Sequence, residues 1–198
     1  MNYKRVTRVI AVVRTPHFVH TNLPSGTAEE INVVIEVPKG SSIKYELDPE
    51  TGAVFVDRRL FTTMVYPCNY GFIPRTIEGD GDPVDVLVLG DYQVVPMSVI
   101  KAVPVGVLLT EDEEGPDAKV IAAPIAKIDP SFSEINDISD VPRYILNQIE
   151  HFFEHYKELE DGKYVKVKGW ESQQAAKNKI SEAIERFRAQ EEKVVKAP

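Results

Sequence analysis

The chain has 198 residues, of which 43% are hydrophobic and 27% charged, a composition typical of one globular domain with a sizeable core. Its 11 glycines and 14 prolines follow no repeat, which excludes collagen-like and low-complexity chains. The net charge of −8 argues against a general electrostatic affinity for nucleic acid or for an anionic membrane surface.

The first 30 residues mix basic, small and turn-forming side chains, and they predict an irregular N-terminal arm with one short strand at Val9–Val13. This apolar run ends at Arg14 without a small-residue cleavage pattern, so a secretory signal peptide is not expected. The most apolar later stretch, Val94–Leu109, contains Lys101 and falls short of the ~20 residues of a membrane-spanning helix. Cys68 is the only cysteine and cannot form an intramolecular disulfide, so we expect a soluble, cytoplasmic protein.

Between residues 31 and 128 the chain consists of short runs rich in Val, Ile and Tyr, each bounded by Pro, Gly, Asp or Ser, which is typical of β-strands. The predicted strands are Ile31–Val37, Ile43–Leu47, Ala53–Arg58, Val84–Leu89, Val99–Leu109 and Lys119–Ala126. In the second run, Lys44 and Glu46 alternate with apolar residues, so their side chains should be neighbours on one face. The turn residues Pro49–Gly52 predict a β-hairpin over 43–58.

The periodicity changes after Asp140, where apolar residues recur every three or four positions. Asp140 as N-cap, Pro142 in the first turn and Gly162 as terminator predict a helix between them. A second helix is predicted over about 172–188. Its apolar stripe consists of Ala176, Ile180, Ala183, Ile184 and Phe187.

Short strands followed by two helices indicate an α+β fold, in which a small β-barrel packs against helices. No linker divides the chain and nothing in it repeats. We therefore expect an N-terminal arm over 1–30, a single domain over 31–190 and a C-terminal tail over 191–198.

Acidic residues are concentrated in two segments that contain no basic residue. Glu78–Asp91 holds five carboxylates, and Glu111–Asp117 holds another five. Carboxylates this dense repel one another, so in a shared pocket some should bind a proton or a cation. Two solvated acidic loops are the alternative interpretation.

Within the first segment, the string DGDPVD places Asp80, Asp82 and Asp85 around a glycine and a proline at the start of an apolar strand. Hard oxygen ligands at this spacing suit Mg²⁺, which takes few carboxylates and keeps waters and substrate phosphates in its remaining positions. An EF-hand is excluded, because its sixth position would be Asp85 instead of glycine and its twelfth would be Asp91 instead of Glu.

Cations and phenols that could hold an anion against such metals also occur in the chain. They are Lys44, Arg58, Lys119, Tyr66, Tyr70, Tyr156 and Lys157. Taken singly, each is more typical of a surface charge or a core aromatic residue, and spacing alone does not distinguish these interpretations.

Five longer strings are more specific: IEVPKGSSIKYELDPETGAVFVDR, YPCNYGFIP, DGDPVDV, EDEEGPDAK and HFFEHYKELEDGKYVKVKGW. Through these strings the chain resembles the soluble family I inorganic pyrophosphatases of the bacterial type, over roughly residues 31–188. The combination, in this order, is far more specific than any one short motif.

The resemblance implies a role for each of fourteen residues. By this resemblance the metal ligands would be Asp80, Asp85, Asp112, Asp117 and Glu46. The catalytic groups would be Asp82 as general base, Tyr70 and Lys119. The phosphate-binding groups would be Lys44, Arg58, Tyr156 and Lys157. Behind them, Glu36 and Tyr66 would orient these groups.

The resemblance further implies Mg²⁺-dependent hydrolysis of pyrophosphate to two orthophosphates, by direct in-line attack of a metal-activated water, on a closed five-stranded OB-like barrel. Mn²⁺ or Zn²⁺ would be the substitutes for Mg²⁺. These residue types suit the hydrolysis of a phosphate anhydride. Metal ions lower the pKa of a bound water, and Lys44, Arg58 and Lys157 would neutralise the negative charge of the phosphates. The alternatives are a metal-dependent phosphatase acting on nucleotides or other phosphate anhydrides, and a small barrel that only binds single strands or Ca²⁺.

His151 and His155 are spaced like a zinc pair, but no Glu stands in the HExxH place and no third ligand is evident. By resemblance, this helix face would instead meet another subunit. We therefore expect a homo-oligomer, with a hexamer favoured, whose association depends on pH near the ~6.5 reference pKa of histidine.

Overall fold

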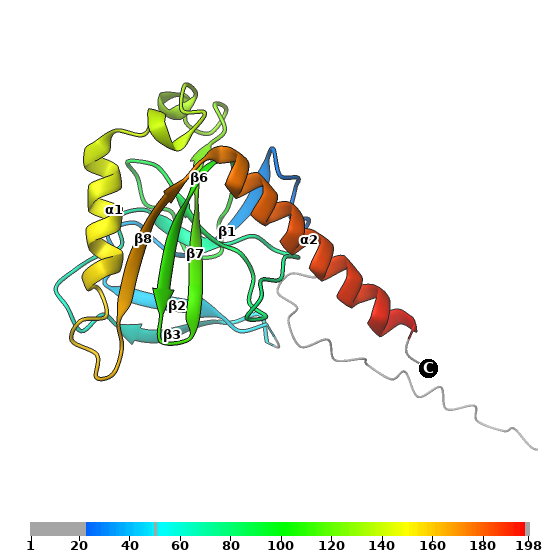
Figure 1. Ribbon diagram of the computed structural model, residues 1–198, viewed down its shortest axis with the longest axis horizontal. Helices are drawn as coiled ribbons and strands as arrows, with labels where there is room; N and C mark the ends of the chain where they lie inside the picture. The colour runs from blue at the N-terminus through cyan, green and yellow to red at the C-terminus, as the bar shows by residue number, and fades with distance from the viewer. Residues whose placement is uncertain (1–22, 50, 197–198) are drawn as a thin grey trace, which may run out of the picture.

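The structure is a computed structural model that describes residues 23–49 and 51–196, so the strand expected at Val9–Val13 lies outside the described residues. The strands are β1 (Ile31–Val37), β2 (Ile43–Leu47), β3 (Val54–Arg59), β4 (Asn69–Phe72), β5 (Asp85–Val88), β6 (Val99–Asp112), β7 (Gly115–Pro124) and β8 (Val165–Glu171). The helices are the short 3₁₀ elements η1 (Pro130–Phe132) and η2 (Ile138–Asp140), and α1 (Arg143–His155) and α2 (Gln173–Lys196). The predicted α+β class is confirmed (Figure 1).

Six strands form a mixed sheet in the order β1-β4-β5-β7-β6-β8, and β1 also pairs with β6. The pairing of β5 with β7 is parallel, whereas the other pairings of this sheet are antiparallel. β2 and β3 form a separate two-stranded antiparallel sheet, which confirms the predicted hairpin.

Two hydrophobic clusters lie on opposite faces of the main sheet, because alternate residues of a strand point to opposite sides. Leu87 of β5 and Ile121 of β7 belong to the cluster that contains the buried side chains of α1. Their neighbours Val86 and Val120 belong to the cluster that contains those of α2. The two helices therefore cover different faces of the sheet (Figure 1), and the stripe predicted for the second helix is buried at all five positions.

Strands β4 and β8 are absent from the prediction. β4 has the sequence NYGF, and its Asn69 and Gly71 disfavour strands, so only tertiary pairing with β1 and β5 explains it. β8 does carry a signal, since Val165 and Val167 alternate with lysines. The strand predicted over 99–109 continues to Asp112 in the structure, and the strand predicted over 119–126 begins earlier, at Gly115. The turn that joins β6 to β7 therefore lies within the second acidic segment.

Both predicted helices differ from the structure at their ends. Asp140 does not cap α1, because it belongs to η2, where its carboxylate accepts the backbone N–H groups of residues 136 and 137 and Pro142 occupies the N-cap of α1. α1 ends at His155 and not near Gly162, since the chain continues in turns closed by three-residue bonds such as Glu158 N–H to His155 O, 3.1 Å. α2 continues to Lys196, past the predicted end at residue 188. No helix in the described part of the chain is long and apolar enough to cross a membrane.

The topology brings the two acidic segments together. The segment between β4 and β5, residues 74–84, is called the acidic loop here because it carries Asp80 and Asp82. It leads into β5, whose parallel partner β7 follows the second acidic segment. Because Val86 pairs with Val120, Asp85 lies beside Lys119, the residue before Val120.

Candidate active site

A cavity of about 540 Å³ opens between the β2–β3 hairpin, the acidic loop, the β6–β7 turn and the segment that follows α1. All fourteen residues given a role by the sequence resemblance line it. They are Glu36, Lys44, Glu46, Arg58, Tyr66, Tyr70, Asp80, Asp82, Asp85, Asp112, Asp117, Lys119, Tyr156 and Lys157. The fold thus gathers residues from six separate segments of the sequence around one space.

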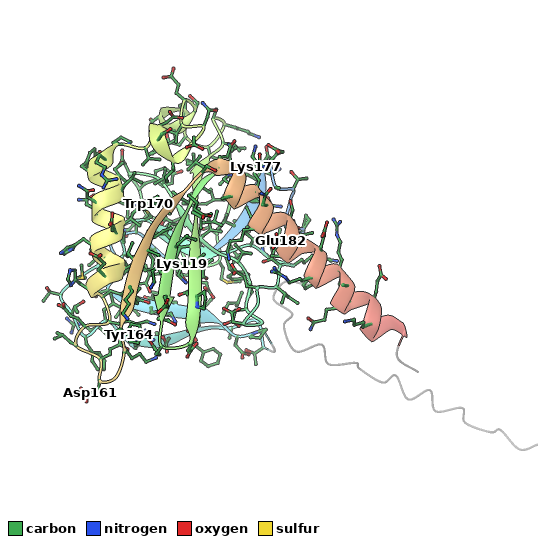
Figure 2. The ribbon with its side chains drawn as sticks, viewed as in Figure 1. Lys119, Asp161, Tyr164, Trp170, Lys177 and Glu182 are labelled. Carbon is green, nitrogen blue, oxygen red and sulfur yellow. The ribbon has the colours of Figure 1, made fainter. Side chains whose placement is uncertain are left out.

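Lys119 of β7 (Figure 2) lines the cavity together with Asp85 and Asp117. Its ammonium donates hydrogen bonds to Asp85 and to Asp117, with Nζ 2.5 Å from Oδ1 of Asp117. The Lys119 side chain is only 6% exposed, and burial alone would lower its pKa, but the two carboxylates outweigh burial and raise it. Burial raises the pKa of Asp117, and although Lys119 opposes this effect, the Asp85 charge adds to it.

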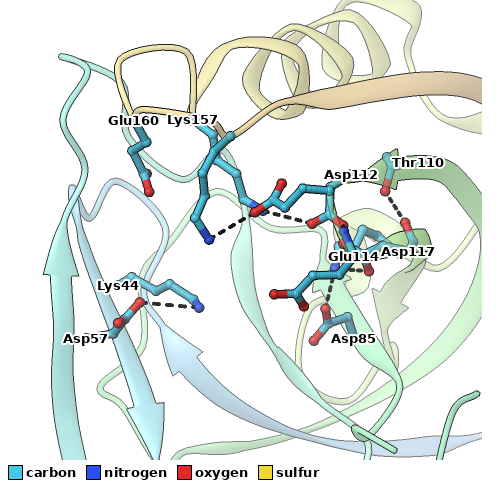
Figure 3. Close-up of polar contacts among 12 residues, drawn as sticks. Lys44, Asp57, Asp85, Thr110, Asp112, Glu114, Asp117, Lys157 and Glu160 are labelled. Atoms are coloured by element: carbon cyan, nitrogen blue, oxygen red, sulfur yellow. Dashed lines mark hydrogen bonds and ion pairs between the residues drawn. The ribbon is translucent and has the colours of Figure 1, made fainter. Parts of the chain in front are cut away.

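Lys157 forms the second contact between a buried cation and the acidic side (Figure 3). It follows α1 in a turn, and its Nζ lies 2.9 Å from Oδ2 of Asp112 at the end of β6, with both side chains about nine-tenths buried. Burial acts to raise the pKa of Asp112, but the hydrogen bonds from Lys157 and from the N–H of Glu114 lower it overall. Glu113 lies 3.7 Å from Lys157 and 2.9 Å from Lys163, which extends the charged network.

A bulge in β3 shapes the cationic side of the cavity. Lys44 pairs with Arg58 and Tyr45 with Val56, so Asp57 is the extra residue that the register skips. A bulge re-aims side chains, and here Asp57 and its neighbour Arg58 both line the cavity. Asp57 Oδ2 lies 2.5 Å from Arg58 Nη1. It also lies 3.4 Å from Lys44 Nζ (Figure 3).

Sequence reasoning missed Asp57 and also Glu160, whose Oε1 lies 3.2 Å from Nε of Arg58. The string FVDR contains Asp57, but regular alternation would send it to the face opposite Arg58, so only the bulge explains its position. The prediction that Lys44 and Glu46 are neighbours is confirmed, since Nζ and Oε1 are 2.5 Å apart.

The floor of the cavity contains a partly buried carboxyl group and three buried phenols. Burial raises the pKa of Glu36 from 4.5 to about 7, while the N–H of Leu47, 2.8 Å from Oε1, partly opposes this effect. Burial also raises the pKa of the phenols of Tyr66, Tyr70 and Tyr156. These phenols therefore remain neutral hydrogen-bond donors at physiological pH.

Carboxylate oxygens are the hard donors that suit a divalent cation. Six carboxylates that the resemblance implies as metal ligands or as the proton acceptor line this one cavity: Glu46, Asp80, Asp82, Asp85, Asp112 and Asp117. Within residues 23–49 and 51–196, no three His, Cys, Asp or Glu side chains are already gathered closely enough to hold an ion. Asp85 and Asp117 share Lys119, and Asp112 binds Lys157. Such a set fits a cation that takes one or two carboxylates and completes its shell with waters and substrate oxygens.

The two histidines do not belong to this set, because the described lining of the cavity contains neither of them. The centroids of their rings are 4.6 Å apart, and Nδ1 of His155 lies 3.1 Å from Oε2 of Glu158. Cys68 is buried and uncharged, since burial raises the pKa of its thiol to about 12.

The chain is similar to known proteins over nearly the whole described structure. Residues 33–188 match the family model described as inorganic pyrophosphatase. An inorganic pyrophosphatase of Saccharolobus solfataricus is 61% identical over 158 residues, which are 80% of this chain and 92% of that protein. One of Aquifex pyrophilus is 53% identical over 85% of this chain and 97% of that protein.

Solved structures give the same result. The inorganic pyrophosphatase of Helicobacter pylori superposes with a TM-score of 0.82 and 51% identity, covering 84% of this chain and 98% of that chain. That of Thermus thermophilus superposes with a TM-score of 0.81 and 47% identity, covering 84% and 97%. Together with the carboxylate- and lysine-lined cavity, these findings show that the chain belongs to the soluble family I inorganic pyrophosphatases.

Proposed function

We propose that the protein hydrolyses inorganic pyrophosphate to two orthophosphates with Mg²⁺, in a direct in-line attack by water. The observation that carries the proposal is the cavity itself, in which two acidic segments face Lys44, Arg58 and Lys157 across a space of about 540 Å³. A multiply charged anion with bound cations needs both kinds of side chain at once. Membership of the family implies a divalent metal requirement, and the hard oxygen donors favour Mg²⁺ within it.

Each charged side chain has a task in this proposal. Asp80, Asp85, Asp112, Asp117 and Glu46 would hold Mg²⁺ directly or through its waters. Bound Mg²⁺ lowers the pKa of water and neutralises phosphate charge. Asp82 accepts the proton of the attacking water, and Tyr70 and Lys119 keep the neighbouring groups oriented by hydrogen bonding.

The cations bind and orient the substrate. Lys44 and Arg58, held in place by Asp57, face one end of the cavity, and Lys157 with Tyr156 approaches from the segment after α1. In the structure these cations are paired with carboxylates. An incoming phosphate would therefore replace a carboxylate as the anionic partner of each cation. Behind this layer, Glu36 accepts the backbone N–H of Leu47, and the buried Tyr66 packs against the ring of Tyr70.

The test compares phosphate release from pyrophosphate, from ATP and from an aryl phosphate, each with MgCl₂. We expect pyrophosphate to be the best substrate by about 10²-fold, because the cations fit a small diphosphate, and we expect EDTA to abolish the activity. Faster release from ATP would instead indicate a phosphatase acting on nucleotides. Salt-sensitive binding of single strands without turnover would indicate the binding module.

Three structural features belong to the same proposal. The pairing circuit β1-β4-β5-β7-β6-β1 supports a closed five-stranded, OB-like barrel, with β8 added at β6. The continuous cores support a single domain over 31–190, with the arm over 1–30 and the tail over 191–198 outside it. The single buried thiol supports action in the cytoplasm.

The oligomeric part of the proposal is a hexamer whose subunits meet over the exposed face of α1. His151 and His155 lie one turn apart on this helix, with Glu158 against His155. Sedimentation velocity at pH 8 and at pH 5 tests it, since positive charge gained by histidine side chains at this face should change the assembly. A particle of the same size at every pH would contradict the role of the histidines, and a monomer throughout would contradict the oligomer.

A further inference from the structure

The acidic loop is closed at its base but contains no regular element. Ile73 N–H donates to Val84 O at 2.9 Å, and Thr76 Oγ1 donates to Ile73 O at 2.6 Å while it accepts Val84 N–H at 3.0 Å. These bonds fix the base of the loop. The position of the loop relative to the cavity depends on its contacts with another element, which is α2.

The middle of α2 contacts the loop through its backbone and two side chains. The N–H of Ile77 donates to the carbonyl of Ala183 at 3.1 Å, and Arg186 Nη1 donates to the carbonyl of Ile77 at 3.3 Å. Lys179 forms an ion pair with Glu78. The helix therefore holds the loop directly before Asp80 and Asp82.

The last turns of α2 hold the loop at a second point, Arg75. Arg75 Nη2 lies 2.7 Å from Oε2 of Glu191, and the guanidinium carbon lies 5.3 Å from the centre of the Phe187 ring. Arg75 has φ +57°, a left-handed conformation that is unfavourable for a residue other than glycine. Such a conformation persists where the surroundings fix it, and Phe187 and Glu191 supply side-chain contacts that do so.

Glu191 lies outside the part of the chain that the family model matches. That match ends at residue 188, whereas α2 continues to Lys196 and extends past the sheet (Figure 1). The contact between Arg75 and Glu191 thus joins the acidic loop to the part of α2 that lies beyond this match. Both side chains are about one-third exposed, so they can be exchanged without opening the core.

We propose that Glu191 is a positioning residue: with Phe187 it fixes Arg75, and thereby sets the affinity of the acidic loop for Mg²⁺. The proposal rests on the proposed role of Asp80 and Asp82 at the metal site. Loss of the contact leaves the ligands and the proton acceptor unchanged but lets the loop depart more often from its binding position. Metal binding should weaken, whereas the rate at saturating metal should stay the same.

The experiment compares wild-type protein with Glu191→Ala and with Lys177→Ala. Lys177 lies on the same helix (Figure 2) but pairs with Glu29 at 2.5 Å, away from the acidic loop, so its variant controls for the loss of a surface ion pair on α2. In metal-free protein, hydrogen exchange of the Ile77 and Glu78 amides should become about threefold to tenfold faster in Glu191→Ala only. Calorimetric titration with MgCl₂ should show a similar loss of affinity, with kcat unchanged at saturating Mg²⁺.

A charge-swapped variant, Arg75→Glu with Glu191→Arg, should recover the wild-type exchange rate and Mg²⁺ affinity in part, because it restores the ion pair but not the contact of the guanidinium with Phe187. Unchanged exchange in Glu191→Ala would overturn the proposed contact. Faster exchange with unchanged Mg²⁺ affinity would overturn its effect on the metal. In that case Asp80→Asn identifies the failing premise, because an Asp80→Asn protein with wild-type Mg²⁺ affinity contradicts the proposed metal role of the loop itself.

Discussion

Lys119 is the residue on which the acidic side of the cavity depends most. Its ammonium neutralises Asp85 and Asp117, which would otherwise repel each other across a partly buried space. Lys119→Met keeps the length of the side chain but leaves both carboxylates without this cation. In EDTA we expect the free energy of unfolding to fall by about 2 kcal/mol, less than for a fully buried pair because the carboxylates are about 30% exposed.

Urea denaturation of the Lys119→Met protein with and without MgCl₂ checks this expectation. Mg²⁺ that binds the folded state should restore part of the lost stability, and the gain should rise with the logarithm of the Mg²⁺ concentration once most sites are occupied. A Lys119→Met protein as stable as wild type in EDTA would contradict the role of Lys119 in neutralising Asp85 and Asp117. A Lys119→Met protein that Mg²⁺ does not stabilise would contradict the binding of a cation by these two carboxylates.

Glu36 should make the stability of the metal-free protein depend on pH. Its pKa is raised by burial from 4.5 to about 7, so between these values the folded state keeps a proton that the unfolded chain has lost. The contribution of Glu36 is therefore complete below pH 4.5, decreases as pH rises, and is lost above pH 7. The loss amounts to on the order of 3 kcal/mol.

The variant Glu36→Gln has no ionisable group at position 36, so the decrease in stability between pH 4.5 and pH 7 should be absent from it. Unfolding free energies of both proteins in EDTA, measured at half-unit steps from pH 4 to pH 8, give the contribution of Glu36 as their difference. A difference that does not change with pH would show that Glu36 titrates alike in both states.

At the level of secondary structure, β4 and β1 approach each other closely at Gly71. A Cβ on Gly71 would overlap the carbonyl oxygen of Val34 and would lie 2.8 Å from Cα of Ile35. Gly71→Ala should therefore separate the strands and reduce the free energy of unfolding by about 3 kcal/mol. Gly90→Ala is the matched control, since its Cβ meets Tyr92 at an ordinary 3.8 Å.

Thermal unfolding of both alanine variants distinguishes the two positions. Gly90→Ala should melt within a few degrees of wild type, whereas Gly71→Ala should melt far lower or fail to accumulate as folded protein. Equal melting temperatures would mean that β4 can move away from β1 without cost, and that the register in this part of the sheet is wrong.

The elements predicted correctly are those whose signal is local. β1, the β2–β3 hairpin and the buried stripe of α2 follow from strand composition, turn residues and helical period. β4 could not be predicted, because Asn69 serves the fold by bonds distant in sequence: its amide accepts the N–H of Lys39 and donates to the carbonyl of Tyr92. The end of α1 was misplaced because Tyr156 and Lys157 leave the helix to enter the cavity.

For the molecule as a whole, the sequence strings identified most of the charged residues of the cavity but, apart from the Lys44–Glu46 pair, not their contacts. Which cation contacts which acid depends on the parallel pairing of β5 and β7 and on the bulge at Asp57, and neither has a local signal. The helical extension that carries Glu191 lies beyond the recognisable strings, so its contact with Arg75 appeared only in the structure. The residues of the cavity were thus more predictable from the sequence than the contacts between them.

The steady-state rate of phosphate release from pyrophosphate, with MgCl₂, tests the central assignment most directly when Asp82→Asn is compared with Asp91→Asn. Both variants remove one negative charge from the same acidic segment, but Asp82 lines the cavity whereas the Asp91 side chain is 91% exposed outside it. Asp82→Asn should lower kcat by about 10²- to 10³-fold through loss of the proton acceptor, and Asp91→Asn should retain the wild-type rate. Equal rates for the two variants would contradict the assignment of Asp82 and, with it, of the cavity as the place of catalysis.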